Sequence, residues 1–89
     1  MKQTRTDWLL VVDMQPAFSC KESPWFVPGY SECAENVSRL VDSFKSNVIF
    51  TCFVPPANPQ GSWQSYYDQH RFALDHSNKR LWELDPQWR

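Results

Sequence analysis

The chain has 89 residues, of which 42% are apolar and 16% aromatic, and its formal net charge at pH 7 is −1. This composition is typical of a folded domain, and the lack of a basic excess argues against nucleic acid as a partner. The longest apolar run, residues 8–12, is too short to cross a bilayer, and residues 1–7 precede no signal-peptide pattern, so we expect a cytoplasmic protein without a membrane partner.

The first predicted element is a strand. Residues 8–13 read WLLVVD, a continuous apolar run that ends in an acid. A strand buried on both faces has this pattern, which indicates a parallel sheet covered by helices, with Asp13 at the C-terminal end of the strand. Residues 14–30 contain three prolines and are predicted to be a loop with a helical turn near Ala17 and Phe18. The aromatic side chains of this loop are too many for an idle surface, so we expect it to fold back over another part of the chain.

A helix and a second strand follow. Ser31 is the predicted N-cap, and Asn47 is expected to end the helix in the left-handed conformation. The predicted apolar stripe of this helix consists of Cys33, Val37, Leu40, Val41 and Phe44. Residues 48–54, VIFTCFV, are β-branched and aromatic and predict a strand that Pro55 stops. A right-handed crossover makes the two strands parallel.

The remaining residues predict two short helices. Ser62 is expected to cap the first, in which Trp63, Tyr66, Tyr67 and His70 share one face. Packing is the favoured interpretation of that face, and a ligand cage is the alternative. Ser77 is expected to cap the second helix, which runs to about Leu84 and is ended by Pro86.

The predicted sheet is too small to be complete. Two strands alone rarely form a stable sheet, and strands buried on both faces need more helices and strands than 89 residues supply. The sequence therefore indicates the α/β class, with residues 1–89 forming one βαβ portion of a domain, and it predicts marginal folding.

The opening of the chain carries a family resemblance. Residues 9–18, LLVVDMQPAF, resemble the start of the isochorismatase-like, or cysteine hydrolase, family, in which an apolar strand runs into an Asp-x-Gln-x-x-Phe motif. Residues 48–55 look like the next strand of that family, and residues 63–67 resemble a segment of one branch. The resemblance implies a three-layer α/β/α, Rossmann-like domain of which residues 1–89 are the N-terminal portion. It also implies hydrolysis of a small amide, imide or vinyl ether, and association into homo-oligomers.

The family's chemistry depends on Asp, Lys and Cys, and the resemblance makes Asp13 the acid. The family's Lys and Cys segments do not occur in these residues, and Lys79 has no recognisable strand context. Cys52 stands where the similar branch commonly has Arg, at a position that touches substrate. We therefore expect these 89 residues alone to be catalytically inactive, and the alternative function is an inactive truncated fragment or a small α/β interaction module.

Three residues besides Asp13 are candidates for substrate contact: Gln15, Phe18 and Cys52. Gln15 either touches substrate or holds the loop by hydrogen bonds, with the second role favoured. Phe18 either walls the pocket or plugs the core. Cys52 lies close to Asp13 if the strands are neighbours, but a carboxylate neighbour disfavours its thiolate, so a nucleophilic role is disfavoured.

Asp13 has support of its own, because open α/β folds place ligands at the C-terminal edge of the sheet. The alternative is an Asp that accepts hydrogen bonds from turn amides. The three cysteines, Cys20, Cys33 and Cys52, match no zinc spacing, and neither do His70 and His76. We expect reduced thiols and neither a metal nor a cofactor.

Overall fold

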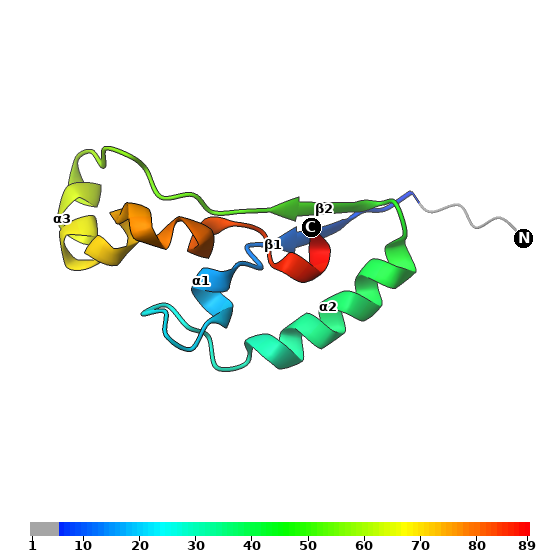
Figure 1. Cartoon of the computed structure of the whole chain (residues 1–89). Helices are drawn as coiled ribbons and strands as arrows, with labels where there is room; N and C mark the ends of the chain where they lie inside the picture. Colours follow the sequence, from blue (N-terminus) through cyan, green and yellow to red (C-terminus); the bar gives the residue numbers. More distant parts are fainter. Residues whose placement is uncertain (1–5) are drawn as a thin grey trace, which may run out of the picture.

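The computed structural model describes residues 6–89 and has a mixed α/β fold (Figure 1). In chain order the elements are β1 (Leu9–Val12), α1 (Pro16–Ser19), α2 (Tyr30–Phe44), β2 (Val48–Thr51), α3 (Ser62–Gln69) and the 3₁₀ helices η1 (Arg71–Leu74), η2 (His76–Trp82) and η3 (Pro86–Trp88). The predicted order of strand, turn, helix and strand is confirmed. No helix within residues 6–89 combines the length and apolar character needed to cross a membrane.

The two strands are parallel, as predicted, and α2 makes the crossover between them. Leu9 pairs with Val48, and Val11 pairs with Phe50. These side chains face α2, because residues two apart on a strand point to the same side. The core consists of the buried residues Val11, Met14, Tyr30 and Ala34, with Leu9, Phe18, Val37, Val41, Val48, Phe50 and Trp88 packed against them.

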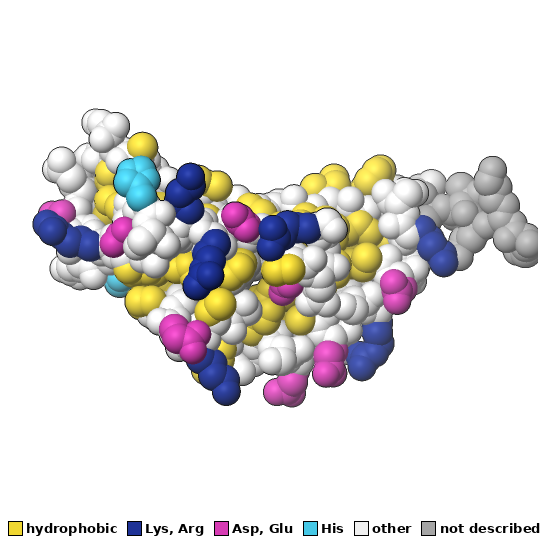
Figure 2. Space-filling model, in the orientation of Figure 1, with side chains coloured by type: hydrophobic (Ala, Val, Ile, Leu, Met, Phe, Trp, Pro, Cys, Tyr) yellow, Lys and Arg dark blue, Asp and Glu magenta, His cyan; other side chains and the backbone are white. Residues whose placement is uncertain are grey.

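The opposite face of the sheet is open to solvent. Leu10 and Val12 are both 57% exposed, and Ile49 is 49% exposed. Figure 1 shows α2 on one side of the strands only, and Figure 2 shows apolar side chains at the surface in the region of the sheet. The prediction of strands buried on both faces is therefore wrong for residues 6–89. A strand with a continuous apolar run is buried on both faces only if a second layer covers the sheet, and no described element forms that layer.

Helix α2 differs from its prediction in where it begins and which side it buries. The helix starts at Tyr30, after Gly29, so Ser31 is not its N-cap. Its buried residues are Tyr30 and Ala34, whereas Leu40, expected in the apolar stripe, is 46% exposed. At the start of the helix the Tyr30 hydroxyl donates to Asp85 Oδ2 at 2.7 Å, which joins this buried end to the C-terminal segment. The residue that adopts positive φ after the helix is Lys45, at 56°, rather than Asn47.

The C-terminal half has 3₁₀ geometry where the sequence predicted a helix to Leu84. Asp75, and not Ser77, is the cap of η2, because its carboxylate accepts from the Ser77 amide at 2.9 Å. The two hydrogen bonds from Ser77 also lower the pKa of Asp75. Pro86 begins η3 instead of ending a helix, since proline suits the first position, where no amide hydrogen is needed.

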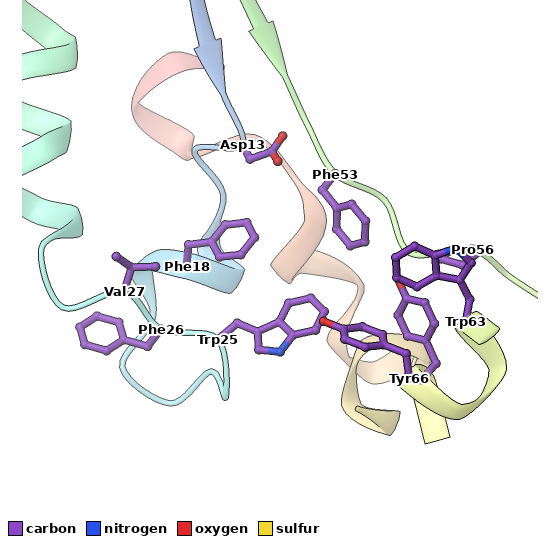
Figure 3. A pocket seen from close by; sticks show the side chains of 10 residues that line it. Asp13, Phe18, Trp25, Phe26, Val27, Phe53, Pro56, Trp63 and Tyr66 are labelled. Carbon is purple, nitrogen blue, oxygen red and sulfur yellow. The ribbon is translucent and has the colours of Figure 1, made fainter. Parts of the chain in front are cut away.

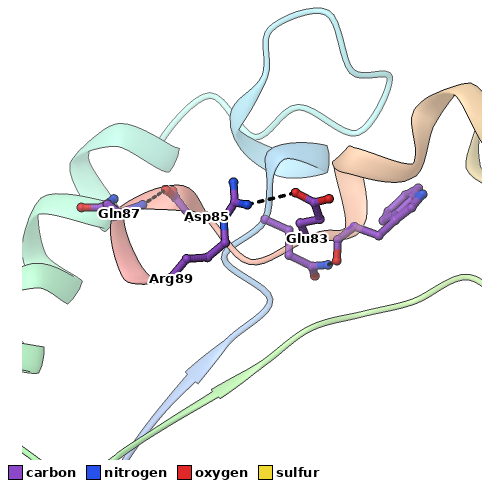
Figure 4. A network of polar contacts seen from close by, with 6 residues as sticks. Glu83, Asp85, Gln87 and Arg89 are labelled. Carbon is purple, nitrogen blue, oxygen red and sulfur yellow. Dashed lines mark hydrogen bonds and ion pairs between the residues drawn. The ribbon is translucent and has the colours of Figure 1, made fainter.

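The segment from Glu83 to Arg89 ties the end of the chain to the residues after β1 (Figure 4). The Asp85 amide donates to the Met14 carbonyl at 2.8 Å, and Trp88 packs on Phe50 with ring centroids 5.9 Å apart. Arg89 forms an ion pair with Glu83 at 3.3 Å. These contacts place the C-terminal segment beside the sheet, on the side that α2 also covers.

Candidate functional site

Asp13 stands directly after β1, where the parallel strands end. Its φ is +57°, a conformation that Asp tolerates better than most side chains. Its amide donates to the Thr51 carbonyl at 3.1 Å and to Thr51 Oγ1 at 3.3 Å. The Thr51 hydroxyl in turn donates to Asp13 Oδ1 at 3.0 Å. The end of β2 therefore fixes both the backbone and the carboxylate of Asp13.

Gln15 joins the chain segments beneath the site and is fully buried, at 0% exposure. Its Nε2 donates to the carbonyls of Phe53 and Trp82, at 2.8 and 2.7 Å, and its Oε1 accepts from the Phe53 amide at 2.8 Å. The side-chain amide thus takes the place of a backbone partner where β1 and β2 have ended. These bonds correspond to the loop-holding role that the sequence favoured, and Gln15 is not among the cavity-lining residues named below.

The loop after α1 folds back as predicted. Ser23 is buried, its hydroxyl donates to the Ala17 carbonyl at 2.6 Å, and the same oxygen accepts from the Trp25 amide at 3.2 Å. The Val27 amide donates to the Phe18 carbonyl at 2.9 Å, which closes the loop onto α1. These bonds direct Trp25 toward the residues that follow β2.

A cavity of about 800 Å³ opens between this loop, the end of the sheet and α3 (Figure 3). We call it the Asp13 cavity. Its lining residues are Asp13, Phe18, Trp25, Phe26, Val27, Phe53, Pro56, Trp63, Tyr66 and Tyr67. The volume lies in the range of pockets that hold small molecules, and a mainly apolar wall with one polar group is typical of such sites. Asp13 is the one charged residue in this lining.

Trp25 connects the two sides of the cavity. Its ring stacks with Phe18, with centroids 6.4 Å apart, and meets Phe72 edge-on at 4.9 Å and Trp82 at 5.7 Å. The ring therefore belongs both to the wall and to the packing behind it. On the other side Tyr67 is buried, and burial, followed by the neighbouring Tyr66, raises the pKa of its hydroxyl.

The structure brings only part of the predicted site together. Phe18 lines the Asp13 cavity and also packs against the core, so both roles considered for it are present. Cys52 is exposed and does not line the cavity. Lys79 lies exposed in η2 and is likewise absent from the lining. Within residues 6–89, no group of three or more His, Cys, Asp or Glu side chains is placed to hold a metal ion.

Several residues of the site were not singled out from the sequence. Thr51 holds the Asp13 carboxylate, and its signal is a hydroxyl at the end of the second strand, level with the acid that ends the first. Phe53 and Trp25 are neighbouring rings of the cavity lining, with centroids 6.3 Å apart. The aromatic face of α3 was identified from the sequence, and both interpretations of it apply. Its residues Trp63, Tyr66 and Tyr67 pack on one another and also line the cavity.

Comparisons with known proteins add no relative: no family model matches the chain, and neither a curated protein nor a solved structure matches it.

Proposed function

We propose that this chain is the N-terminal portion of an isochorismatase-like hydrolase, that its Asp13 cavity binds a small organic molecule, and that Asp13 exchanges a proton with it. The observation that carries the proposal is the position of Asp13. It is the sole acid on an aromatic wall, at the C-terminal edge of a parallel strand pair, which is where open α/β folds hold ligands. The Asp-x-Gln-x-x-Phe resemblance supports the same residue as the acid.

The geometry around the carboxylate suits proton transfer. Thr51 donates to Oδ1 and holds the group in one orientation. Within residues 6–89 no donor contacts Oδ2, which leaves that oxygen for a bound molecule. Acid catalysis by one carboxyl group is sufficient for a vinyl ether, whereas an amide or imide in this family also needs a cysteine nucleophile. The lining contains neither Lys nor Cys, so a vinyl ether is the substrate class that we favour for residues 1–89 alone.

The second candidate function is a binding module without turnover. The lining of the cavity favours this function, because the cavity has a ligand-sized volume but lacks the nucleophile and the cation of the family's triad. We further propose a cytoplasmic protein that associates with copies of itself and binds neither nucleic acid nor membrane. In that proposal its two strands belong to the sheet of a three-layer α/β/α domain.

A panel of small vinyl ethers, amides and imides tests the proposal. The absent Lys and Cys segments predicted an inactive chain, but the single carboxyl group in the cavity leads us to expect vinyl-ether hydrolysis by the unmodified chain. Asp13→Asn should lower kcat/KM for it by about 10²–10⁴-fold. Asparagine tolerates the positive φ of this position and so preserves the fold. Asp68→Asn, which removes an exposed carboxylate on α3 outside the lining, is the matched control and should keep full activity. Ligand binding without hydrolysis of any compound would reject the hydrolase in favour of the binding module.

A further inference from the structure

The lining of the Asp13 cavity carries charge of one sign only. Asp13 is negative, the other lining residues are aromatic or aliphatic, and no Lys, Arg or His belongs to the lining. Among residues 6–89 the hydrogen-bond partner of the Asp13 carboxylate is a hydroxyl group, that of Thr51, and no ion pair neutralises it. Asp13 is half-buried, and its carboxylate on an otherwise apolar wall attracts a cation and repels an anion.

The aromatic rings of the cavity favour the same sign of ligand. Phe53 and Tyr66 each lie with their ring centroids 6.3 Å from that of Trp25. Figure 3 shows these three side chains and Phe18 around one hollow, with Asp13 at its edge. The face of an aromatic ring is electron-rich and attracts an organic cation within about 6 Å of the ring centroid. A group placed over Trp25 therefore lies close to more than one ring and faces the Asp13 carboxylate across the hollow (Figure 3).

We propose that the Asp13 cavity selects a small organic cation, of the quaternary or alkylammonium class, over a neutral or anionic molecule of the same shape. The cationic group contacts the rings of Trp25 and Tyr66, and Asp13 supplies the counter-charge. An anion is disfavoured by both the carboxylate and the ring faces. This inference rests on the proposed function only in taking the cavity as the binding site, and it does not require that the chain hydrolyse its ligand.

The test compares two ligands of equal shape. Choline carries a trimethylammonium group, and its neutral isostere is the alcohol with a tert-butyl group in the same place. Binding of each is measured by titration calorimetry and by tryptophan fluorescence, independently of any hydrolysis assay. We expect choline to bind the unmodified chain about tenfold more tightly than the alcohol, which is the preference that one or two cation–π contacts provide.

Variants separate the charge from the rings. Asp13→Asn should lower choline affinity toward that of the alcohol, while Asp13→Glu, which keeps the charge, should retain part of the preference. Tyr66→Leu should weaken choline binding several-fold, and Tyr66→Phe, which keeps the ring, should not. Asp68→Asn is again the control for removing a carboxylate. Near-ultraviolet circular dichroism of each variant shows that its aromatic packing is intact.

Three outcomes would overturn the proposal: equal binding of choline and the alcohol, no binding of either, or a choline preference that persists in Asp13→Asn. Equal binding of both ligands leaves a neutral apolar site, which is compatible with the proposed hydrolase. If the unmodified chain hydrolyses no vinyl ether but prefers choline to the alcohol, the hydrolase is rejected and the cation site is supported. The two proposals therefore fail in distinguishable ways.

Discussion

At the scale of single residues, the buried amide of Gln15 joins three backbone groups beneath the site. Replacing it with leucine leaves the amide and carbonyl of Phe53 and the carbonyl of Trp82 without their partner. Each unpaired buried group costs about 1–3 kcal/mol. We therefore expect Gln15→Leu to lower the free energy of unfolding by at least roughly 3 kcal/mol in urea titrations. The control, Gln64→Leu on the exposed surface of α3, should change it by less than about 0.5 kcal/mol; similar losses in both variants would contradict the assigned role of Gln15.

Tyr30 makes the free energy of unfolding depend on pH in the alkaline range. Burial, and then its hydrogen bond to Asp85, raise the pKa of Tyr30 above its ordinary value of 10.0. The neutral hydroxyl is thus favoured in the folded state, and this stabilisation is complete below pH 10 and declines as pH rises above it. We expect a decline of about 1.4 kcal/mol per pH unit from this group.

Tyr30→Phe measures that contribution. The variant loses the hydrogen bond at neutral pH, but its unfolding free energy should fall less steeply than that of the unmodified chain between pH 10 and 11. Tyr67, whose pKa burial also raises, contributes to the slope that remains in the variant. Identical slopes in the two proteins would show that Tyr30 does not titrate as its burial requires.

The residues of the site were predictable to the extent that local pattern determines them. Asp13 is identifiable because an apolar run ends in an acid, and Phe18 because it completes a motif. Thr51 acquires its role only through pairing with a strand 38 residues away. The same holds for the bond between Gln15 and Trp82, which are 67 residues apart. Contacts across such separations depend on the tertiary fold, and no local sequence pattern indicates them.

At the scale of elements, two backbone positions have similar dihedral angles, but one is occupied by lysine and the other by glycine. Lys45, after α2, has φ +56° and ψ −115°, and Gly61, before α3, has φ +59° and ψ −136°. Only glycine adopts such angles without strain. We expect Lys45→Gly to raise the free energy of unfolding by about 1 kcal/mol and Gly61→Ala to lower it by about 1–2 kcal/mol.

The control is Gly29→Ala. At both Gly29 and Gly61 an added Cβ would meet no atom within 4 Å, so the two alanine variants differ in backbone angle and not in crowding. Gly29 has φ −91°, and its replacement should be neutral or slightly stabilising. Thermal and urea unfolding of the three variants provide the check. If Gly29→Ala lowered the free energy of unfolding as much as Gly61→Ala, the positive φ of Gly61 would not be the cause of the loss.

The order of the elements from β1 to β2 was predictable, and the ends of the elements were not, for a physical reason. The apolar and β-branched runs specify β1 and β2, and the spacing of Val37 and Val41 specifies α2. The ends are set by partners that local sequence does not reveal. Tyr30, the first residue of α2, bonds to Asp85, 55 residues away, and η2 is capped by Asp75 because that carboxylate accepts from the Ser77 amide. Ser31 and Ser77 are suitable capping residues in positions where a neighbour takes the role.

At the scale of the whole molecule, two adjacent valines point to different faces of the sheet, one covered and one open. Val11 is 4% exposed against α2, whereas Val12 points to the open side. Valine and threonine have the same shape, so Val11→Thr and Val12→Thr differ only in where the hydroxyl is placed. We expect Val11→Thr to cost roughly 1–3 kcal/mol of unfolding free energy and Val12→Thr less than about 0.5 kcal/mol.

Urea unfolding measured at several protein concentrations checks this prediction. An equally large cost for Val12→Thr would mean that the face is covered in solution, and a concentration-dependent cost would assign the cover to another copy of the chain. The sequence indicated that residues 1–89 cannot cover both faces of this sheet. It did not indicate which face stays open, because a continuous apolar run carries no alternation from which the two sides can be told apart.

The bonds that Gln15 and Asp85 make also determine when the site can exist. The turn after β1 and the wall formed by Phe53 are joined through Gln15 to Trp82, 67 residues further along, and Met14 is bonded to Asp85. Ordering them requires closure of a long loop, whose entropic cost exceeds that of the local helices. During synthesis the β1–α2–β2 unit can therefore assemble before the cavity does, because Trp82 and Asp85 are added to the chain after it.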